Sequence, residues 1–200
     1  MTLDQYRDTA DRLLVPFVSA ADSVGLSPNG VSVIAFGFAV AAGGAFALAE
    51  PMWYALGAVF VFINGWLDLV DGALAREQGV SSKAGDLLDH VLDRYADIVI
   101  LVGLSAASGS FVLGLAAVTG VLMTSYLGTQ IQAVGLGRAY GGLVGRADRL
   151  ALIGLVGAAS AVYPAAIGAF TLVGWLLVFF AIIGHFTALQ RFWGAWSDLT

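Results

Sequence analysis

Apolar residues occur along the chain in long blocks separated by short polar breaks. The blocks lie at roughly 31–49, 52–75, 86–107, 110–134, 148–163 and 165–190. Several of them reach the ~20 residues that a bilayer-spanning helix needs. The breaks contain residues that end helices or form turns, at Glu50-Pro51, Ser108-Gly109-Ser110 and Pro164. This pattern predicts an all-α integral membrane bundle of six transmembrane helices.

The N-terminal segment follows a different pattern. From Leu3 to Val24, apolar residues recur at helical spacing with acidic and basic residues between them. Such a stripe is typical of an amphipathic helix in the membrane interface, although a cap packed on the bundle would show the same pattern. We therefore expect one membrane domain over residues 1–200, with an interfacial helix at 3–24 and the six-helix bundle at 31–190.

Composition agrees with a membrane location. The 200 residues are 59% hydrophobic and 12% charged, with a mean hydropathy of +0.87, whereas about a quarter of the residues of a soluble domain are charged. The absence of cysteine excludes disulfides and thiolate metal sites. The net charge of −5 argues against a basic nucleic-acid surface. Acidic polar segments with a single lysine, Lys83, suit a high-salt cytoplasm and indicate a halophile.

The positions of the basic residues predict the orientation in the membrane. The connections around residues 50, 109 and 164 carry no Lys or Arg. The basic residues gather at the opposite helix ends, at Arg7, Arg12, Arg76, Lys83, Arg94, Arg138, Arg146, Arg149 and Arg191. By the positive-inside rule, this end and both termini of a multi-pass protein face the cytoplasm.

Four aspartates are the candidate metal ligands. Asp68 and Asp71 are three residues apart on the second predicted span, and Asp89 and Asp93 are four apart on the third, so each pair shares a helix face. A short loop joins the two spans, and we expect them to be antiparallel neighbours whose carboxylates converge. Converging carboxylates repel each other unless cations bind between them. Oxygen ligands favour Mg²⁺, Mn²⁺ or Ca²⁺, and two such ions can clamp a diphosphate.

Other classes of protein also bury acidic residues in a membrane. A salt-bridged helix end is one alternative, and a carboxylate-lined cation channel or transporter is another. Transporters often have repeated halves and place their ionisable residues near mid-membrane. This chain has no evident repeat, and its aspartates lie near the ends of predicted spans, beside a glycine and an arginine that suit a phosphate ligand, Gly72 and Arg76.

The spacing Asp-x2-Asp-Gly-x2-Ala-Arg-x8-Gly-x3-Asp-x3-Asp resembles the signature of CDP-alcohol phosphotransferases. All of its fixed positions are matched, at Asp68, Asp71, Gly72, Ala75, Arg76, Gly85, Asp89 and Asp93. The resemblance implies a membrane enzyme of phospholipid biosynthesis that moves a lipid phosphate from a CDP-linked lipid to an alcohol and releases CMP. It also implies a homodimer.

The resemblance further implies roles for the matched residues. The four aspartates would hold two divalent cations, Mg²⁺ or Mn²⁺, and Asp93 would also deprotonate the acceptor hydroxyl. The CDP site would be lined by Gly72, Ala75, Arg76 and Gly85.

Three arginines suggest the kind of acceptor. Arg138, Arg146 and Arg149 flank the start of the fifth span, and guanidinium forks match phosphate monoesters, although positive-inside anchoring explains some of them equally well. The run 145–150 also resembles the Arg-x2-Arg segment of phosphatidylinositol-phosphate synthases and their archaeal relatives. That resemblance implies inositol 1-phosphate as acceptor, and the acidic, lysine-poor composition favours an archaeal enzyme that uses CDP-archaeol rather than CDP-diacylglycerol. Glycerol 3-phosphate is the alternative acceptor.

Overall fold

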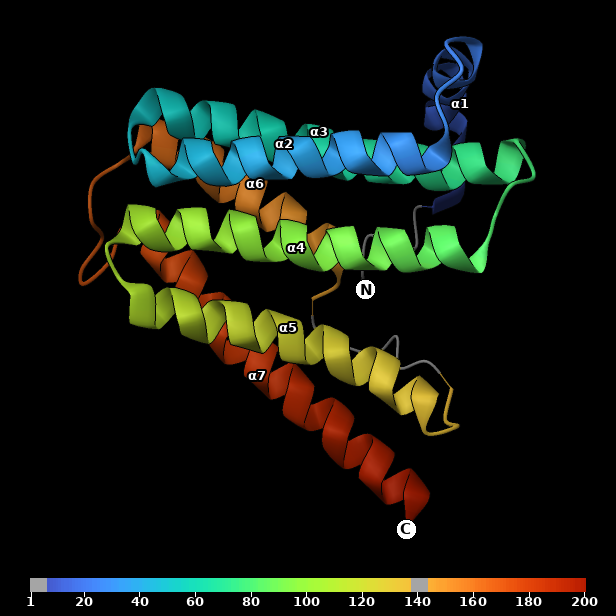
Figure 1. Cartoon of the computed structure of the whole chain (residues 1–200). Helices are drawn as coiled ribbons and strands as arrows, with labels where there is room; N and C mark the ends of the chain where they lie inside the picture. Colours follow the sequence, from blue (N-terminus) through green and yellow to red (C-terminus); the bar gives the residue numbers. More distant parts are fainter. Residues whose placement is uncertain (1–6, 138–143) are drawn as a thin grey trace.

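The computed structural model describes residues 7–137 and 144–200 as seven α-helices, and these residues form no sheet (Figure 1). The helices are α1 (Arg7–Ser23), α2 (Pro28–Ala47), α3 (Pro51–Glu77), α4 (Lys83–Ser108), α5 (Phe111–Ala133), α6 (Arg146–Val162) and α7 (Leu172–Leu199). The all-α prediction is confirmed for the described residues.

Hydroxyl side chains begin several of these helices. The Oγ of Ser27 accepts a hydrogen bond from the backbone N–H of Gly30, with an N–O distance of 3.2 Å. The Oγ of Ser82 accepts one from the backbone N–H of Gly85 at 3.1 Å. Such caps satisfy amide groups that the first turn of a helix leaves without partners. At the other end of α4, Gly109 has a φ of 69°, which ends the helix in the left-handed region. Helix α2 ends at Ala47 and α3 begins at Pro51, so the breaks expected near residues 50 and 109 are both confirmed.

The last helix differs from the sequence prediction. A helix was expected at 165–190, whereas α7 spans Leu172–Leu199. After Pro164 the chain forms a turn in which the Ile167 amide donates to the Phe170 carbonyl at 2.8 Å, with a φ of 66° at Gly168. This turn delays the helix to the cap at Thr171. Arg191, expected after the last helix, consequently lies inside α7.

Helix α2 lies between α3 and α4 and packs along both. The expectation that α3 and α4 are direct neighbours is therefore wrong, because each packs mainly against α2. Small residues make the close packing possible: a Cβ added at Gly43 of α2 would lie 2.5 Å from the Val99 carbonyl oxygen of α4. The other main contacts join α3 with α6, α4 with α5, and α5 with α7.

Four of the described helices, α2, α3, α5 and α7, are long and apolar enough to cross a membrane. Many large apolar side chains on them are exposed, among them Val40, Phe62, Leu115 and Ile182. The protein is therefore a multi-pass membrane protein. The three connections without Lys or Arg lie at one end of the bundle, on the left in Figure 1.

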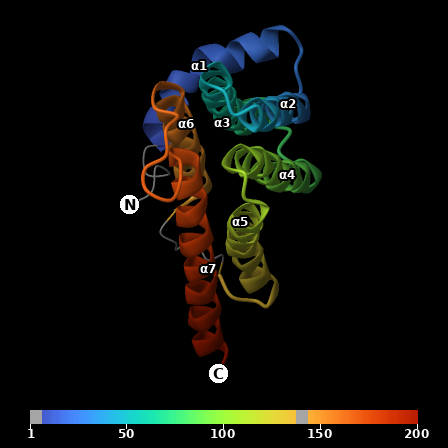
Figure 2. The ribbon, with the colours of Figure 1, turned by 90° about the vertical axis from the view of Figure 1, so that its left-hand side faces the viewer.

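Helix α1 crosses the bundle instead of running along it. Its axis is roughly perpendicular to those of α2 and α3 in both views (Figures 1 and 2). Leu14 and Val18 pack against Val70 and Leu74 of α3 in a small apolar cluster. Helix α1 is thereby fixed to the half of α3 that carries Asp68 and Asp71.

Candidate active site

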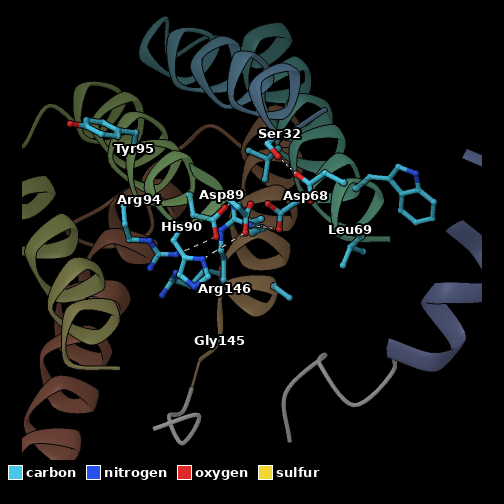
Figure 3. Close-up of a pocket in the computed structure, with 18 of the residues that line it drawn as sticks. Ser32, Asp68, Leu69, Asp89, His90, Arg94, Tyr95, Gly145 and Arg146 are labelled. Carbon is cyan, nitrogen blue, oxygen red and sulfur yellow. Dashed lines mark hydrogen bonds and ion pairs between the residues drawn. The ribbon is translucent and has the colours of Figure 1, made fainter. Parts of the chain in front are cut away.

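The structure brings together three of the four predicted metal ligands. The carboxylates of Asp68, Asp71 and Asp89, here called the carboxylate cluster, each offer an oxygen within 4.8 Å of the others. Asp68 and Asp71 come from α3, and Asp89 comes from α4. Asp68 and Asp89 are labelled in Figure 3. Helix α2 adds Ser32, whose Oγ donates a hydrogen bond to Asp71 Oδ2 at 2.6 Å. Asp71 is only 6% exposed, so this hydroxyl fixes a buried carboxylate.

The donor set of the carboxylate cluster fits a hard divalent cation. It offers only oxygen ligands, which Mg²⁺ and Mn²⁺ prefer. Three carboxylates held this close repel each other, and a bound cation removes that repulsion.

Asp93 lies beside the carboxylate cluster and is paired with arginine. Its Oδ1 forms an ion pair with Arg146 Nη2 at 2.6 Å, and its Oδ2 lies 3.5 Å from Arg94 Nη2. Arg146 Nη1 also pairs with Asp68 Oδ2. One guanidinium at the start of α6 thus links α3 to α4, as Figure 3 shows.

Arg149 and Arg94 join Arg146 in a group that we call the arginine cluster. Arg149 Nη2 donates to Asp97 Oδ2 at 2.9 Å, and Arg94 Nη1 lies 3.8 Å from the same oxygen. Arg94 Nη1 also donates to Ser125 Oγ of α5. Arg149, expected to be an acceptor ligand, is 6% exposed and ion-paired. The remaining predicted acceptor residue, Arg138, lies outside the described residues.

A cavity of about 2190 Å³ connects these groups. Its polar part is lined by the carboxylate cluster, Asp93 and the arginine cluster. All of the residues predicted for the CDP site, Gly72, Ala75, Arg76 and Gly85, line it as well. Apolar side chains of α3 and α6, including Val59, Phe62, Leu155 and Val162, continue the wall away from the charged groups. The cavity therefore suits a ligand with a charged head and an apolar tail.

Several residues of this site are not positions of the aspartate motif. Ser32 and Asp97 contact the charged groups directly, and Arg191 of α7 lines the cavity and donates to the Thr124 carbonyl at 2.5 Å. The sequence does offer a signal for Asp97, because an acidic residue within an apolar stretch requires a partner. For Ser32 and Arg191 we find no comparable signal.

Comparisons with known proteins agree with this geometry. The family model described as CDP-alcohol phosphatidyltransferase matches residues 25–196. The chain is 30% identical to the archaetidylinositol phosphate synthase of Methanothermobacter thermautotrophicus over 98% of this chain and 95% of that protein. It is 35% identical to the phosphatidylinositol phosphate synthase of Mycolicibacterium smegmatis over 74% and 68% of the two chains.

A solved structure shows the same fold. The phosphatidylinositol phosphate synthase of Mycobacterium tuberculosis, solved with CDP-DAG bound, superposes with a TM-score of 0.80 at 25% identity, covering 92% of this chain and 94% of that one. The family match and the long alignments with its members lead to one conclusion. This chain belongs to the CDP-alcohol phosphatidyltransferase family, among relatives of the archaetidylinositol and phosphatidylinositol phosphate synthases.

Proposed function

We propose that the protein transfers a lipid phosphate from a CDP-linked lipid to inositol 1-phosphate and releases CMP. The observation that carries the proposal is the carboxylate cluster beside the arginine cluster in one cavity with an apolar extension. The names of the relatives support inositol phosphate as acceptor. CDP-DAG in the mycobacterial neighbour supports a CDP-linked lipid as donor, either CDP-archaeol or CDP-diacylglycerol.

In this reaction Asp93 is the general base. The acceptor hydroxyl attacks the phosphorus next to the lipid, the bond from that phosphorus to the oxygen of CMP breaks, and the hydroxyl proton passes to the Asp93 carboxylate. Arg146 and Arg94 hold this carboxylate in place. We assign two divalent cations, Mg²⁺ or Mn²⁺, to Asp68, Asp71, Asp89 and Asp93. When bound, the cations supply charge stabilisation for the diphosphate and for the departing CMP.

The CDP moiety is assigned to the wall formed by Gly72, Ala75, Arg76 and Gly85. At Gly72 an added Cβ would meet only Arg76 Nη1, at 3.6 Å, so packing within the described residues does not require a glycine at this position. Its absence instead leaves room for a ligand to approach the helix backbone. Arg76 is the phosphate-directed guanidinium of this wall.

The acceptor phosphate is assigned to Arg146 and Arg149, with Arg138 as a further candidate from the sequence. The Nε atoms of Arg146 and Arg149 are buried and have no hydrogen-bond partner among the described residues. Buried donors usually have partners, so these two N–H groups support the binding of an anionic ligand that would accept their hydrogen bonds.

The proposed membrane arrangement completes the function. We assign six spans to α2–α7 in a single domain, adding α4 and α6 to the four apolar helices because they pack along α2 and α3. Helix α1 is assigned to the interface, and the site and both termini to the cytoplasmic side, on the strength of the basic residues at that end. The resemblance to the family supports a homodimer.

The test is CMP release by purified protein with CDP-archaeol or CDP-diacylglycerol, with Mg²⁺ or Mn²⁺ and with one acceptor at a time. CMP that appears with inositol 1-phosphate, and stops when a chelator is added, is the expected result. CMP with glycerol 3-phosphate in its place would identify the other acceptor. Folded protein that releases no CMP with any acceptor would refute the enzyme and favour a cation channel or transporter.

A further inference from the structure

Asp97 is a buried carboxylate that the proposed reaction does not use. It lies on α4 one turn beyond Asp93 and is 4% exposed. It does not line the large cavity, although both arginines that it contacts, Arg94 and Arg149, do. A carboxylate buried in a membrane protein is costly unless it is paired and hydrogen-bonded. Its place behind the cavity wall means that it acts through these two side chains.

One oxygen of Asp97 fixes guanidinium groups from two helices. Oδ2 accepts from Arg149 Nη2 of α6 at 2.9 Å and lies 3.8 Å from Arg94 Nη1 of α4. Arg94 is held further by Asp93 and by Ser125 of α5. The contact with Asp97 thus determines where the Arg149 fork lies relative to the acceptor side of the cavity.

The pairing leaves donors of Arg149 for a ligand. Only Nη2 of its guanidinium contacts Asp97, and Nε is buried without a hydrogen-bond partner among the described residues. A guanidinium carries five N–H donors in a rigid fork, so holding one nitrogen orients all of the others. Side chains behind the ligand-contacting groups commonly set the orientation of those groups in this way.

We infer that Asp97 is a positioning residue that orients Arg149 toward the phosphate monoester of the acceptor. This inference rests on the proposed function, since it assigns Asp97 to the phosphorylated acceptor of that reaction. Asp97 itself touches neither substrate. Replacing it therefore weakens acceptor binding and leaves the CDP-lipid site unchanged.

The test compares Asp97→Asn with wild type in steady-state CMP release. The acceptor KM is expected to rise on the order of 10-fold to 100-fold, by analogy with the loss of a residue that orients a metal ligand. The CDP-lipid KM and the kcat at saturating acceptor stay within about twofold. Asp97→Glu keeps the charge and is expected to show the same split with a smaller rise. It also provides the test if the Asn variant does not fold.

Ile100→Ala is the matched control. Ile100 lies one turn further along α4, is fully buried and belongs to the apolar core. Its truncation is expected to lower the Tm without changing the ratio of the two KM values. Equal rises of both KM values in Asp97→Asn, or a lower Tm with an unchanged acceptor KM, would make Asp97 a structural ion-pair partner and overturn the inference.

A second readout does not depend on turnover. Inorganic phosphate is expected to raise the Tm of the wild type and to do so much less for Asp97→Asn, while CDP raises both equally. If the wild type releases no CMP with any acceptor, the proposed function fails, and this phosphate difference still tests the role of Asp97. Equal protection of both proteins by phosphate would refute the positioning role.

Discussion

The carboxylate cluster and the arginine cluster face the same cavity, yet their charges are balanced differently. The carboxylate cluster brings like charges together, because oxygens of Asp68, Asp71 and Asp89 lie within 4.8 Å of one another. In the arginine cluster, every guanidinium already has an aspartate partner. The first arrangement favours the binding of cations, which would offset the repulsion between the carboxylates, whereas the second is already ion-paired and offers only its remaining donors.

Their places in the chain differ as well. The carboxylate cluster comes from two consecutive helices, and α2 between them supplies Ser32. The arginine cluster joins α4 to α6, and Asp97 and Arg149 are 52 positions apart in the sequence. The difference fits the proposal that the carboxylate cluster holds the cations and that the arginine cluster binds the acceptor phosphate.

The largest expected effect is on turnover, in Asp93→Asn. An amide cannot take the proton of the acceptor hydroxyl, and loss of a general base lowers kcat by about 10²-fold to 10⁴-fold. Binding of the CDP-lipid is expected to persist, which equilibrium binding to the purified variant measures. Asp198→Asn makes the same chemical change at an exposed position near the end of α7 and is the control. Wild-type CMP release by Asp93→Asn would remove Asp93 from the mechanism.

The same contrast explains what could be predicted from the sequence. Helical spacing and one short connection predict the convergence of Asp68 and Asp71 with Asp89, and the carboxylates do converge, although the two helices are not direct neighbours. The insertion of α2 between α3 and α4 was missed, because six apolar blocks of similar hydropathy do not reveal which blocks pack together. Close packing at Gly43 becomes apparent only in three dimensions.

The arginine cluster was predicted less well, because its contacts join helices that are distant in the sequence. Charge and position indicated that Arg146 and Arg149 lie near the site, but not that they pair with Asp93 and Asp97, since no local rule links α4 with α6. The start of α7 was missed because the turn at Ile167 is a backbone feature within an apolar stretch. Hydropathy does not detect such a turn.

The second effect is on the free energy of unfolding and tests whether the ion pairs of the arginine cluster stabilise the protein. Among the described residues, Arg149→Ala leaves the buried Asp97 with only the longer contact to Arg94, and breaking a buried pair costs about 3–5 kcal/mol. Thermal or denaturant unfolding in detergent measures the loss. The double variant Arg149→Met with Asp97→Leu is expected to recover most of the stability, because both charges are gone, while its acceptor KM stays high. Wild-type stability of Arg149→Ala would contradict the ion-pair account.

A smaller effect separates a ligand-facing glycine from a packing glycine. Gly72→Ala is expected to raise the CDP-lipid KM by tenfold or more, about 1–3 kcal/mol of steric cost, without lowering the Tm. Gly184→Ala should do the reverse, since its Cβ would lie 2.6 Å from the Gly120 carbonyl carbon where α5 meets α7. Steady-state kinetics and thermal unfolding of both variants provide the comparison. A Gly72→Ala protein with wild-type KM would place CDP elsewhere.

The smallest expected effect tests the residue that joins the two clusters. Arg146 pairs with Asp68 and Asp93, so in metal-free protein its guanidinium competes with cations for these carboxylates. Arg146→Ala is expected to bind Mn²⁺ about tenfold more tightly, a difference of about 1.4 kcal/mol, in a titration followed by electron paramagnetic resonance. Its acceptor KM should rise at the same time, more than its CDP-lipid KM, because a phosphate donor is lost.

Lys83→Ala is the control for this last comparison. Lys83 is exposed at the start of α4, and its removal deletes the same charge near the same membrane end. Solvent and salt screen an exposed charge, so its Mn²⁺ affinity is expected to stay near that of the wild type. Weaker Mn²⁺ binding by Arg146→Ala would mean that Arg146 organises the carboxylates for the cation. Tighter binding would mean that the arginine cluster limits how strongly the carboxylate cluster holds its ions.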